Sequence, residues 1–383
     1  MMLQKKNKIL FINAATLRMG GGKSVAINFL KTLGENYKDE KFIAVVPALD
    51  DYRKIKYENI KLYFVPVYFH NPVFRIFLDY WVIDKLEKSG AKKVFNMGNI
   101  ALPTNKYRQI TLFHFPYAIY PESKIWKKLG LKSLIVHKLM VLLFAKRIKY
   151  SEYFLAQTQT AKKRLMKYYH LNADKIFIAP NAISLNNFKG EIVPDDYIRN
   201  MTFVENTYKC LCLSVYYVHK NIEVLIDVAE LIKKNNEKIQ IFLTITEKDN
   251  PNVKQILNTI KAKRLESILV NLGRVPMEKI GYLYSRIDAL LLPTILESFT
   301  GTYVESMFFK KKILTSDMDF AREICKNNTW FFDPEDPEDI LNKIVESKNS
   351  NFTKAADQAF KDVLKMKDWN QTTDIIINTI NKI

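Results

Sequence analysis

The sequence predicts an α/β protein of two doubly wound domains with a C-terminal helical tail. The chain has 383 residues, which is enough for two domains of ordinary size. In both halves, short apolar runs alternate with helical patterns, as is typical of parallel sheets covered on both faces. A polar, aperiodic stretch at 184–206 separates the halves and indicates a domain boundary.

The first predicted domain, residues 1–184, begins with a strand in KILFINAA and a helix in SVAINFLKTL. Its other apolar runs predict strands at 42–47, 60–67, 92–98, 110–115, 153–158 and 175–181. Helical patterns lie between them, at 72–88, within 124–149 and after 158.

Residues 185–206 are the predicted linker, and residues 207–350 the second domain. Its predicted strands are CLCLSV, IQIFLTI, ILVNLG, ALLLPT, KKILTS and WFFD, with helices beginning near Asn221, Pro251, Pro276, Thr302 and Met318. Residues 351–383 are expected to be helical throughout and to pack back toward the N-terminal domain. Ligands bind outside the carboxyl ends of such strands, so a site is expected in the cleft between two Rossmann-like domains.

The composition restricts the class of protein. The net charge of +19 suits nucleic acid, an anionic membrane surface or phosphorylated substrates as partners, unless it reflects lysine usage alone. The three cysteines form no C-x-x-C pair, which disfavours a disulfide framework and a structural zinc site and fits a reducing cytoplasm. The basic, then apolar N-terminus is a strand pattern and not a signal peptide.

The stretch TLRMGGGKSVAINFL looks like a phosphate-binding loop, but it fits neither common motif. A P-loop needs a glycine where Leu17 stands, and the dinucleotide fingerprint needs one at Val25. What remains is a glycine loop between a strand and a helix, in which backbone N–H groups can approach an anion. The alternative is a glycine turn that only connects the two elements.

The most specific segment is LLLPTILESFTGTYVESM, in which Glu297 and Glu305 are eight residues apart. Glu297 precedes a predicted helix, and Glu305 lies about one turn inside it. The N–H groups and dipole of the helix start can hold a phosphate between the two carboxylates. Carboxylates accept hydrogen bonds from hydroxyls, so one can hold a sugar ring and the other a ribose. The segment therefore predicts a nucleotide-sugar site.

Several further stretches extend this pattern: AQTQTAKKRLMKYYHLNADKIFIAPNAI, SVYYVHKNIEVLIDV, NLGRVPMEKIGYLYSRIDALLLPTILESFTGTYVESM and FDPEDPEDI. In these stretches the chain resembles the family 4 retaining glycosyltransferases of the GT-B fold, within the glycosyl transferases group 1. The resemblance covers nearly the whole second domain and the end of the first.

The resemblance implies a role for each matching residue of the second domain. Glu297 would bind hydroxyls of the donor sugar, Glu305 the ribose hydroxyls, and Lys220 the diphosphate. Val275 would lie against the base. Backbone N–H groups facing the donor sugar and diphosphate would come from Phe299, Thr300, Gly301 and Thr302.

In the first domain, the resemblance makes His114, in LFHFPY, the active-site histidine beside the donor sugar. Gly21 and Gly22 match a glycine loop near the donor phosphates and the acceptor. Each residue also has a structural alternative: Glu305 as a solvated helix glutamate, Lys220 as a surface or capping lysine, and His114 as a core histidine. His219 is expected to be structural.

Two departures from the family pattern stand out. Ser214 replaces an arginine that usually accompanies Lys220, and the cations offered as substitutes are Arg274, Lys279 and Lys23. Ser298 and Thr300 replace glycines around the first glutamate, which makes that loop stiffer.

The expected reaction uses a UDP-, GDP- or ADP-sugar donor and needs no cofactor and no metal. Lys220, the loop N–H groups and the helix dipole would stabilise the departing nucleotide diphosphate. Family behaviour implies retention at the anomeric carbon. A basic nucleic-acid-binding protein, suggested by charge alone, and a non-catalytic homologue are the alternatives, and no nucleic acid is expected as a partner.

The stretch 124–149 carries eight Lys or Arg residues and no acid, and its apolar centre is too short to span a bilayer. It predicts either a basic amphipathic helix on an anionic surface or a domain helix with a buried centre and snorkelling lysines. The first reading indicates a cytoplasmic protein, peripheral on the inner face of the plasma membrane, with a lipid-linked glycan acceptor in cell-surface polysaccharide assembly. A soluble acceptor is the alternative.

Overall fold

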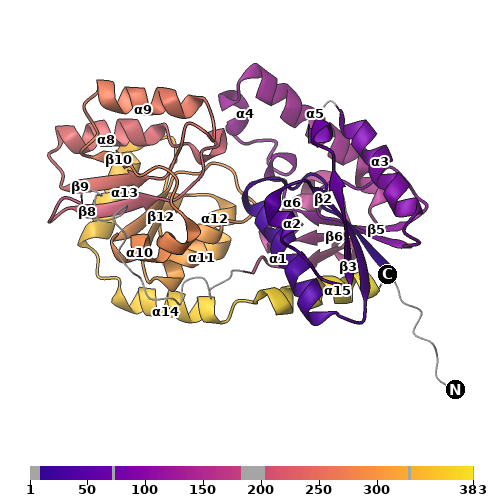
Figure 1. Ribbon diagram of the computed structural model, residues 1–383. Helices are drawn as coiled ribbons and strands as arrows, with labels where there is room; N and C mark the ends of the chain where they lie inside the picture. The colour runs from indigo at the N-terminus through magenta and orange to yellow at the C-terminus, as the bar shows by residue number, and fades with distance from the viewer. Residues whose placement is uncertain (1–8, 71–73, 183–202, 327–328, 383) are drawn as a thin grey trace. The chain divides into compact units, whose positions relative to one another are not determined.

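The computed structural model describes residues 9–70, 74–182, 203–326 and 329–382 (Figure 1). The chain divides into two compact units. Unit 1 comprises Met1–Pro121, Gly130–Ala182 and Lys367–Ile383; unit 2 comprises Glu122–Leu129 and Ile183–Met366. The predicted boundaries place 122–129 in the first domain, whereas in the structure Glu122–Leu129 belongs to unit 2. Residues 185–202 of the predicted linker lie outside the described residues.

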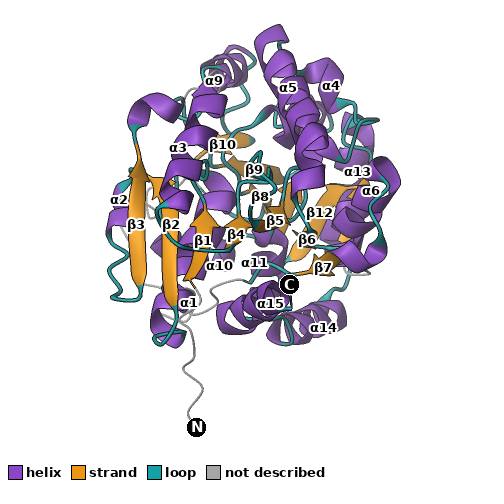
Figure 2. Cartoon of the chain, turned by 90° about the vertical axis from the view of Figure 1, so that its right-hand side faces the viewer, coloured by secondary structure: helices purple, strands orange, loops and turns teal. Residues whose placement is uncertain are grey.

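Unit 1 contains one parallel sheet of seven strands in the order β3-β2-β1-β4-β5-β6-β7, seen side by side in Figure 2. The predicted apolar runs become these strands: β1 Ile9–Asn13, β2 Lys41–Pro47, β3 Ile60–Val65, β4 Lys93–Asn96, β5 Arg108–Phe113, β6 Tyr153–Ala156 and β7 Ile176–Ile178. Its helices are α1 Gly20–Asn36, α2 Asp50–Arg53, α3 Arg75–Glu87, α5 Leu131–Arg147, α6 Gln159–Tyr169 and α15 Trp369–Asn381.

Successive side chains of a strand point to opposite faces of this sheet, and both faces are covered by helices. Leu10 and Ile12 of β1 belong to the cluster that includes α1 and α15, whereas Phe11 between them belongs to the cluster under α3. The last helix, α15, lies alongside α1 (Figures 1 and 2). The C-terminal helix therefore completes the core of unit 1.

Unit 2 contains a parallel sheet of six strands in the order β10-β9-β8-β11-β12-β13. Its strands are β8 Tyr208–Cys212, β9 Ile239–Leu243, β10 Leu269–Asn271, β11 Ala289–Leu292, β12 Lys312–Ser316 and β13 Thr329–Phe332. Its helices are α4 Ile125–Lys128, α8 Val224–Lys234, α9 Asn252–Ala262, α10 Ile280–Ser285, α11 Gly301–Phe308, α12 Asp319–Cys325, α13 Pro337–Asn349 and α14 Thr353–Leu364. Both sheets have the strand order of doubly wound nucleotide-binding folds, which confirms the predicted fold class.

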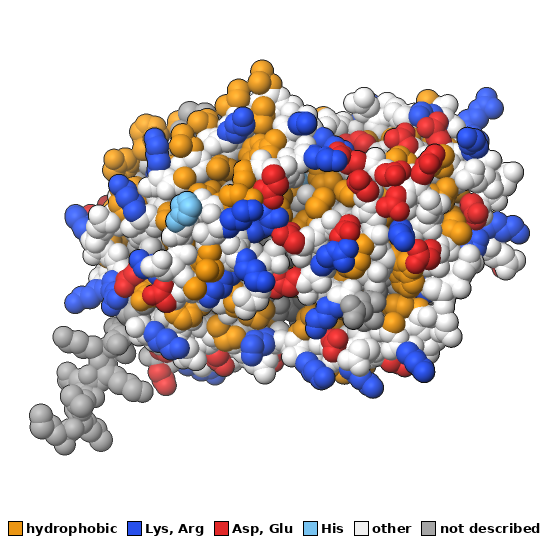
Figure 3. Space-filling model, turned by 180° about the vertical axis from the view of Figure 1, so that it is seen from behind, with side chains coloured by type: hydrophobic (Ala, Val, Ile, Leu, Met, Phe, Trp, Pro, Cys, Tyr) orange, Lys and Arg blue, Asp and Glu red, His pale blue; other side chains and the backbone are white. Residues whose placement is uncertain are grey.

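Single 3₁₀ turns complete the secondary structure: Val67–His70, Pro116–Ala118, Ile148–Tyr150 and Ala173–Lys175 in unit 1, and Val218–Lys220 and Met277–Lys279 in unit 2. Among the described residues, no helix has both the length and the apolar character required to cross a bilayer. On the face drawn in Figure 3, lysine and arginine side chains lie among acidic ones and form no single stripe.

Three local predictions need correction. Helix α1 begins at Gly20, so the glycines form its first turn and not a loop before it. The basic stretch 124–149 is two helices, α4 and α5, because Gly130 is extended and begins a new helix. The C-terminal tail is interrupted after Leu364, and Asp368 starts α15 with a capping box in which Gln371 takes part.

A buried ion pair joins α3 to α5 within unit 1. The guanidinium of Arg147 donates to Asp79, which Arg75 also approaches to 3.1 Å. Asp79 and Arg147 are 2% and 7% exposed. Removing one partner of such a pair leaves a buried charge without compensation, which is far more costly than losing an exposed pair.

Asp79→Ala is therefore expected to lower the stability of unit 1 by about 3–5 kcal/mol, measured as a drop in its calorimetric midpoint. Glu152→Ala breaks the exposed Arg108–Glu152 pair and is the matched control, with an expected loss below about 1 kcal/mol. Equal losses in the two variants would contradict the importance of burial.

Candidate functional site

The strand order reverses in each unit at one point, between β1 and β4 in unit 1 and between β8 and β11 in unit 2. Loops that leave the carboxyl ends of neighbouring strands at such a point diverge and leave room for a ligand. In unit 2 these are the loop after β8, which ends at Asn221, and the loop from Pro293 to Thr300 that leads into α11.

An ion pair and a backbone hydrogen bond join these two loops. The N–H of Ile295 donates to the carbonyl of His219 at 2.9 Å. The ammonium of Lys220 donates to Oε1 of Glu297, and these two side chains are 15% and 13% exposed. The structure thus brings together the two residues predicted to contact the diphosphate and the donor sugar.

His219 lies at the same place, although the sequence suggests only a structural role for it. Its Nε2 is 3.9 Å from Oε1 of Glu297, and its ring stacks on Tyr217 with centroids 5.3 Å apart. The carboxylate of Glu297 therefore has Lys220 and an imidazole beside it, and a flat aromatic surface adjoins it.

Helix α11 begins directly after the Glu297 loop. Its cap residue, Thr300, is extended and makes no side-chain cap hydrogen bond, and the first turn holds no acid. Within the described residues, the buried Oγ1 of Thr302 also has no hydrogen-bond partner. The first N–H groups of this helix are thus free of a side-chain cap, as anion binding at a helix start requires. The predicted residues Phe299, Thr300, Gly301 and Thr302 all lie here.

Glu305 lies one turn inside α11, and its contacts differ from those of Glu297. The hydroxyl of Tyr284, from α10, donates to Oε2 of Glu305 at 3.4 Å and to the carbonyl of Thr302 at 3.2 Å. Burial raises the pKa of Glu305 from 4.5 to about 7, against a smaller opposing effect of the Tyr284 hydrogen bond. This carboxyl is therefore not the solvated helix glutamate of the structural alternative.

The other residues of unit 2 that the sequence singles out are Val275, Arg274 and Ser214. Val275 is half-buried and packs against the cluster that contains Leu211 and Phe242. Arg274 is exposed. At Ser214, the place of the expected arginine, the N–H donates to Oγ1 of Thr244 at 3.0 Å and the hydroxyl donates to the carbonyl of Val215 at 2.8 Å.

Lys23, one of the cations offered as a substitute for that arginine, belongs to unit 1. Its ammonium pairs with Asp51 at 2.7 Å. This contact gives Lys23 a partner within its own unit, between the first turns of α1 and α2.

In unit 1, the structure brings His114 against the start of α1. The N–H of His114 donates to Oδ1 of Asn99 at 2.6 Å. A Cβ added at Gly22 would lie 3.3 Å from Nε2 of His114, so the imidazole packs on the glycine backbone. Burial lowers the pKa of His114 from 6.5 to about 4. The imidazole is therefore neutral at pH 7, and its buried Nδ1 has no partner among the described residues.

A buried amide network supports the loop that carries Asn99. Asn13 donates to Asn96 at 3.0 Å, and Asn96 donates to Gln109 at 2.9 Å, across β1, β4 and β5. Gln109 in turn bonds the N–H and the carbonyl of Leu102. Because buried amides are costly unless paired, this network fixes the backbone on both sides of Asn99.

Sequence reasoning missed Tyr284, Asn99 and Asn221. Asn221 is 2% exposed with a φ of 54°; its amide donates to the carbonyl of Pro334 at 2.6 Å and accepts from Lys128 at 2.7 Å. Asparagine tolerates the left-handed conformation better than most residues, so its position directly after Lys220 was a usable signal. Nothing local marks Tyr284, since its partner lies 21 residues away.

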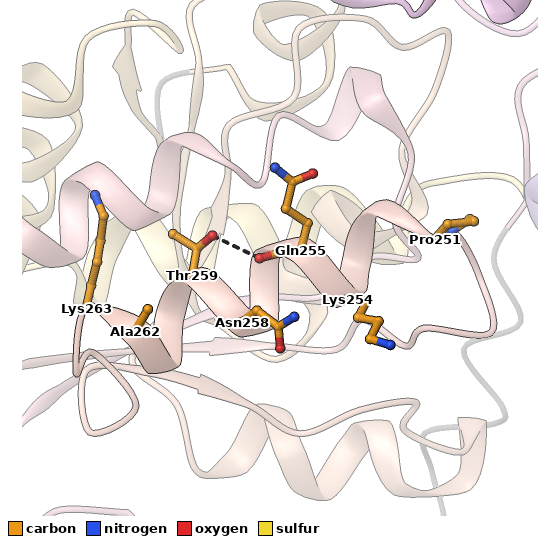
Figure 4. A pocket seen from close by; sticks show the side chains of 7 residues that line it. All are labelled: Pro251, Lys254, Gln255, Asn258, Thr259, Ala262 and Lys263. Atoms are coloured by element: carbon orange, nitrogen blue, oxygen red, sulfur yellow. Dashed lines mark hydrogen bonds between the residues drawn. The ribbon is translucent and has the colours of Figure 1, made fainter.

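A separate hollow runs along α9 of unit 2 (Figure 4). Its lining comes from that helix and its ends, and Thr259 donates to the carbonyl of Gln255 at 2.9 Å. None of its lining residues belongs to the predicted site: Pro251, Lys254, Gln255, Asn258, Thr259, Ala262 and Lys263.

Adjacent glycines of α1 are expected to respond differently to alanine. A Cβ at Gly22 would lie 3.1 Å from Leu17 and 3.3 Å from His114, whereas one at Gly21 meets nothing within 4 Å. Gly22→Ala should lower Tm and shift the imidazole NMR signals of His114. Gly21→Ala should keep Tm or raise stability by about 0.5–1 kcal/mol. An unchanged Tm and unchanged His114 signals in Gly22→Ala would contradict the close packing.

Glu305 is expected to make stability depend on pH. Its pKa is raised on folding, from 4.5 to about 7, so its favourable contribution is complete below pH 4.5 and is lost as the pH rises through 7. Glu305→Gln should therefore gain stability relative to wild type between pH 5 and 8, by on the order of 2–3 kcal/mol, in urea unfolding. Exposed Glu247→Gln should show no such trend, and a pH-independent difference for Glu305→Gln would refute the shift.

Comparisons with known proteins found a matching family model, similar sequences and similar solved structures. Residues 195–361 match the family model of the glycosyl transferases group 1. The O-antigen chain mannosyltransferase RfbU of Salmonella typhimurium is 22% identical over 67% of this chain and 65% of that protein. The phosphatidylinositol N-acetylglucosaminyltransferase GPI3 subunit of Saccharomyces cerevisiae is 22% identical over 68% and 57%.

Among solved structures, Anabaena Alr3699/HepE in complex with UDP-glucose has a TM-score of 0.74 and 16% identity, over 98% of this chain and 100% of that chain. The chain spans 57–65% of the length of the curated relatives that it matches. The two sheet orders and these matches lead to one assignment: the chain has the GT-B fold, and its residues 195–361 match the model of the glycosyl transferases group 1 family.

Proposed function

We propose that this protein transfers a sugar, with retention, from a nucleotide-diphosphate sugar to a hydroxyl acceptor, as a family 4 glycosyltransferase. The observation that carries the proposal is the Lys220–Glu297 ion pair at the start of α11, with Glu305 one turn further on. A cation, uncapped N–H groups and two carboxyls in this arrangement suit a molecule with a phosphate between two hydroxyl-bearing rings.

Each group has a proposed part in donor binding. Lys220 and the N–H groups of Thr300, Gly301 and Thr302 bind the diphosphate, and Phe299 adds its N–H toward the donor sugar. Glu297 accepts hydrogen bonds from sugar hydroxyls and Glu305 from ribose hydroxyls. Val275 lies against the base, and the proposed second cation in place of the arginine missing at Ser214 is Arg274, Lys279 or Lys23.

For unit 1, the proposal assigns His114 a contact with the donor sugar, and Gly21 and Gly22 contacts with the donor phosphates and the acceptor. The pKa of His114, lowered by burial to about 4, suits a neutral hydrogen-bonding group better than an acid. A neutral imidazole can accept or donate at the sugar without adding charge to the site.

The proposed step breaks the bond between the anomeric carbon and the β-phosphate oxygen. The acceptor hydroxyl forms the new bond on the face that the diphosphate leaves, and its proton passes to a phosphate oxygen. Lys220, the N–H groups and the dipole of α11 stabilise the charge on the nucleotide diphosphate. No cofactor and no metal ion is proposed, so activity should survive EDTA.

We propose a glycan or lipid-linked glycan as acceptor, in cell-surface polysaccharide assembly, with the protein peripheral on the inner face of the plasma membrane. Two relatives act, by their names, on O-antigen chains and on phosphatidylinositol, which supports a lipid-linked substrate. A soluble acceptor is the second candidate, since the donor site is the same for both.

The test is binding of nucleosides, nucleoside diphosphates and sugar nucleotides of uracil, guanine and adenine, followed by donor hydrolysis. One base should be preferred, and its diphosphate should bind much more tightly than its nucleoside. Lys220→Gln should weaken diphosphate binding about 10- to 100-fold, because a charge-assisted contact contributes about 1.5–3 kcal/mol, and should leave nucleoside binding unchanged.

Lys234→Gln removes the same charge from an exposed position on α8 and is the control. A Lys220→Gln variant that loses nucleoside and diphosphate binding equally would show a structural lysine and overturn the assigned role. Binding of the sugar nucleotide without hydrolysis or transfer to any acceptor would favour a non-catalytic homologue.

A further inference from the structure

Helix α5 of unit 1 is hardly buried. Of its 17 residues, only Phe144 and Arg147 are buried. Phe144 packs with Phe113 and Phe154, at centroid distances of 5.2 and 6.3 Å. The first three turns of this helix contribute no buried residue to the core, although they are rich in leucine, isoleucine and valine.

The exposed apolar residues of α5 form one stripe. Leu131, Ile135, Leu139 and Leu142 are each 49–74% exposed. Their spacings of four, four and three residues place them on one side of a helix with 3.6 residues per turn. A soluble surface rarely presents such a continuous stripe without a binding function.

The first half of α3 presents a second apolar surface. Phe74 immediately before the helix, and Ile76, Phe77 and Tyr80 within it, are 39–67% exposed. The Asp79–Arg147 pair joins α3 to α5 within unit 1, and their two apolar surfaces are together called here the α3–α5 face. Orange hydrophobic side chains gather at the upper left of Figure 3, over the region of these helices.

Lysines border the stripe on α5. At 3.6 residues per turn, Lys138 lies at one edge of the apolar stripe and Lys132 at the other. Lys146 lies in the last turn of α5, after the last residue of the stripe. All three side chains are exposed. The sequence from 124 to 149 holds no acidic residue, so the charge around the stripe is positive only.

Other charged residues on α3 and in the basic stretch have partners of their own. Asp84 on α3 pairs with Lys85 and Lys88. Lys124, just before α4, and Lys128, at its end, belong to the same basic stretch of sequence, and both pair with Glu335 within unit 2. Of the lysines in the basic stretch, Lys132, Lys138 and Lys146 are exposed and lie on α5.

We propose that the α3–α5 face docks on an anionic lipid bilayer, with α5 lying in the plane of the interface. An apolar stripe between lysines fits this surface, because apolar side chains enter the headgroup boundary while ammonium groups reach the anionic lipids. This inference rests on the proposed lipid-linked acceptor for its biological purpose only; docking itself requires no transferase activity.

The test is sedimentation of the full chain with vesicles of phosphatidylglycerol and phosphatidylcholine, or phosphatidylcholine alone, at 50 and 500 mM salt. Binding should occur on anionic vesicles and weaken at high salt. Lys132→Gln, Lys138→Gln and Lys146→Gln together should weaken it about 100-fold, at about fivefold per lysine. Ile135→Ser with Leu139→Ser should also weaken vesicle binding, at both salt concentrations.

The matched control is Lys234→Gln, Lys254→Gln and Lys261→Gln, which removes three exposed lysines of α8 and α9 in unit 2 and should leave vesicle binding unchanged. Donor binding is measured on every variant and should not change. Absence of binding to anionic vesicles, or equal loss in both lysine triples, would overturn the inference even if donor binding persists.

Self-association gives the other adverse result. If sedimentation velocity shows a dimer that Ile135→Ser with Leu139→Ser dissolves and that vesicles do not, the α3–α5 face is an interface between copies of this chain. If the wild-type protein binds anionic vesicles but binds no sugar nucleotide, the proposed function is refuted and the docking proposal is still supported.

Discussion

The site in unit 2 depends on the pairing of Lys220 with Glu297. Each residue lies in the loop that follows one of two neighbouring strands, β8 and β11, at the point where the strand order reverses. The hydrogen bond from Ile295 to His219 joins the same loops through their backbones. A half-buried carboxylate without this ammonium would lose its compensation, so the pair holds the loop before α11 against the loop after β8.

The two glutamates predicted to bind hydroxyls, Glu297 and Glu305, have different environments. Glu297 has a cation beside it, whereas Glu305 faces Tyr284, and burial raises the pKa of Glu305 to about 7. At pH 7 the Glu305 carboxyl is thus about half neutral. The two carboxyls have different neighbours, which suits the proposal that one meets sugar hydroxyls and the other ribose hydroxyls.

Most of the fold could be predicted because the signals are local. Apolar runs such as ALLL mark strands buried on both faces, and the spacing of Glu297 and Glu305 marks a loop and a helix start. The remainder depends on contacts distant in sequence. No local pattern shows that Lys124 pairs with Glu335, that Tyr284 reaches Glu305, or that the glycines belong to α1 and not to the loop before it.

A crystal structure with a bound, slowly hydrolysed sugar nucleotide tests the central claim most directly. The account predicts the diphosphate on the N–H groups that begin α11 with Lys220 at hydrogen-bond distance, and sugar hydroxyls on Glu297. The ribose should lie on Glu305. A ligand bound in unit 2 with its diphosphate remote from Lys220 and α11, and with the Lys220–Glu297 pair untouched, would contradict it.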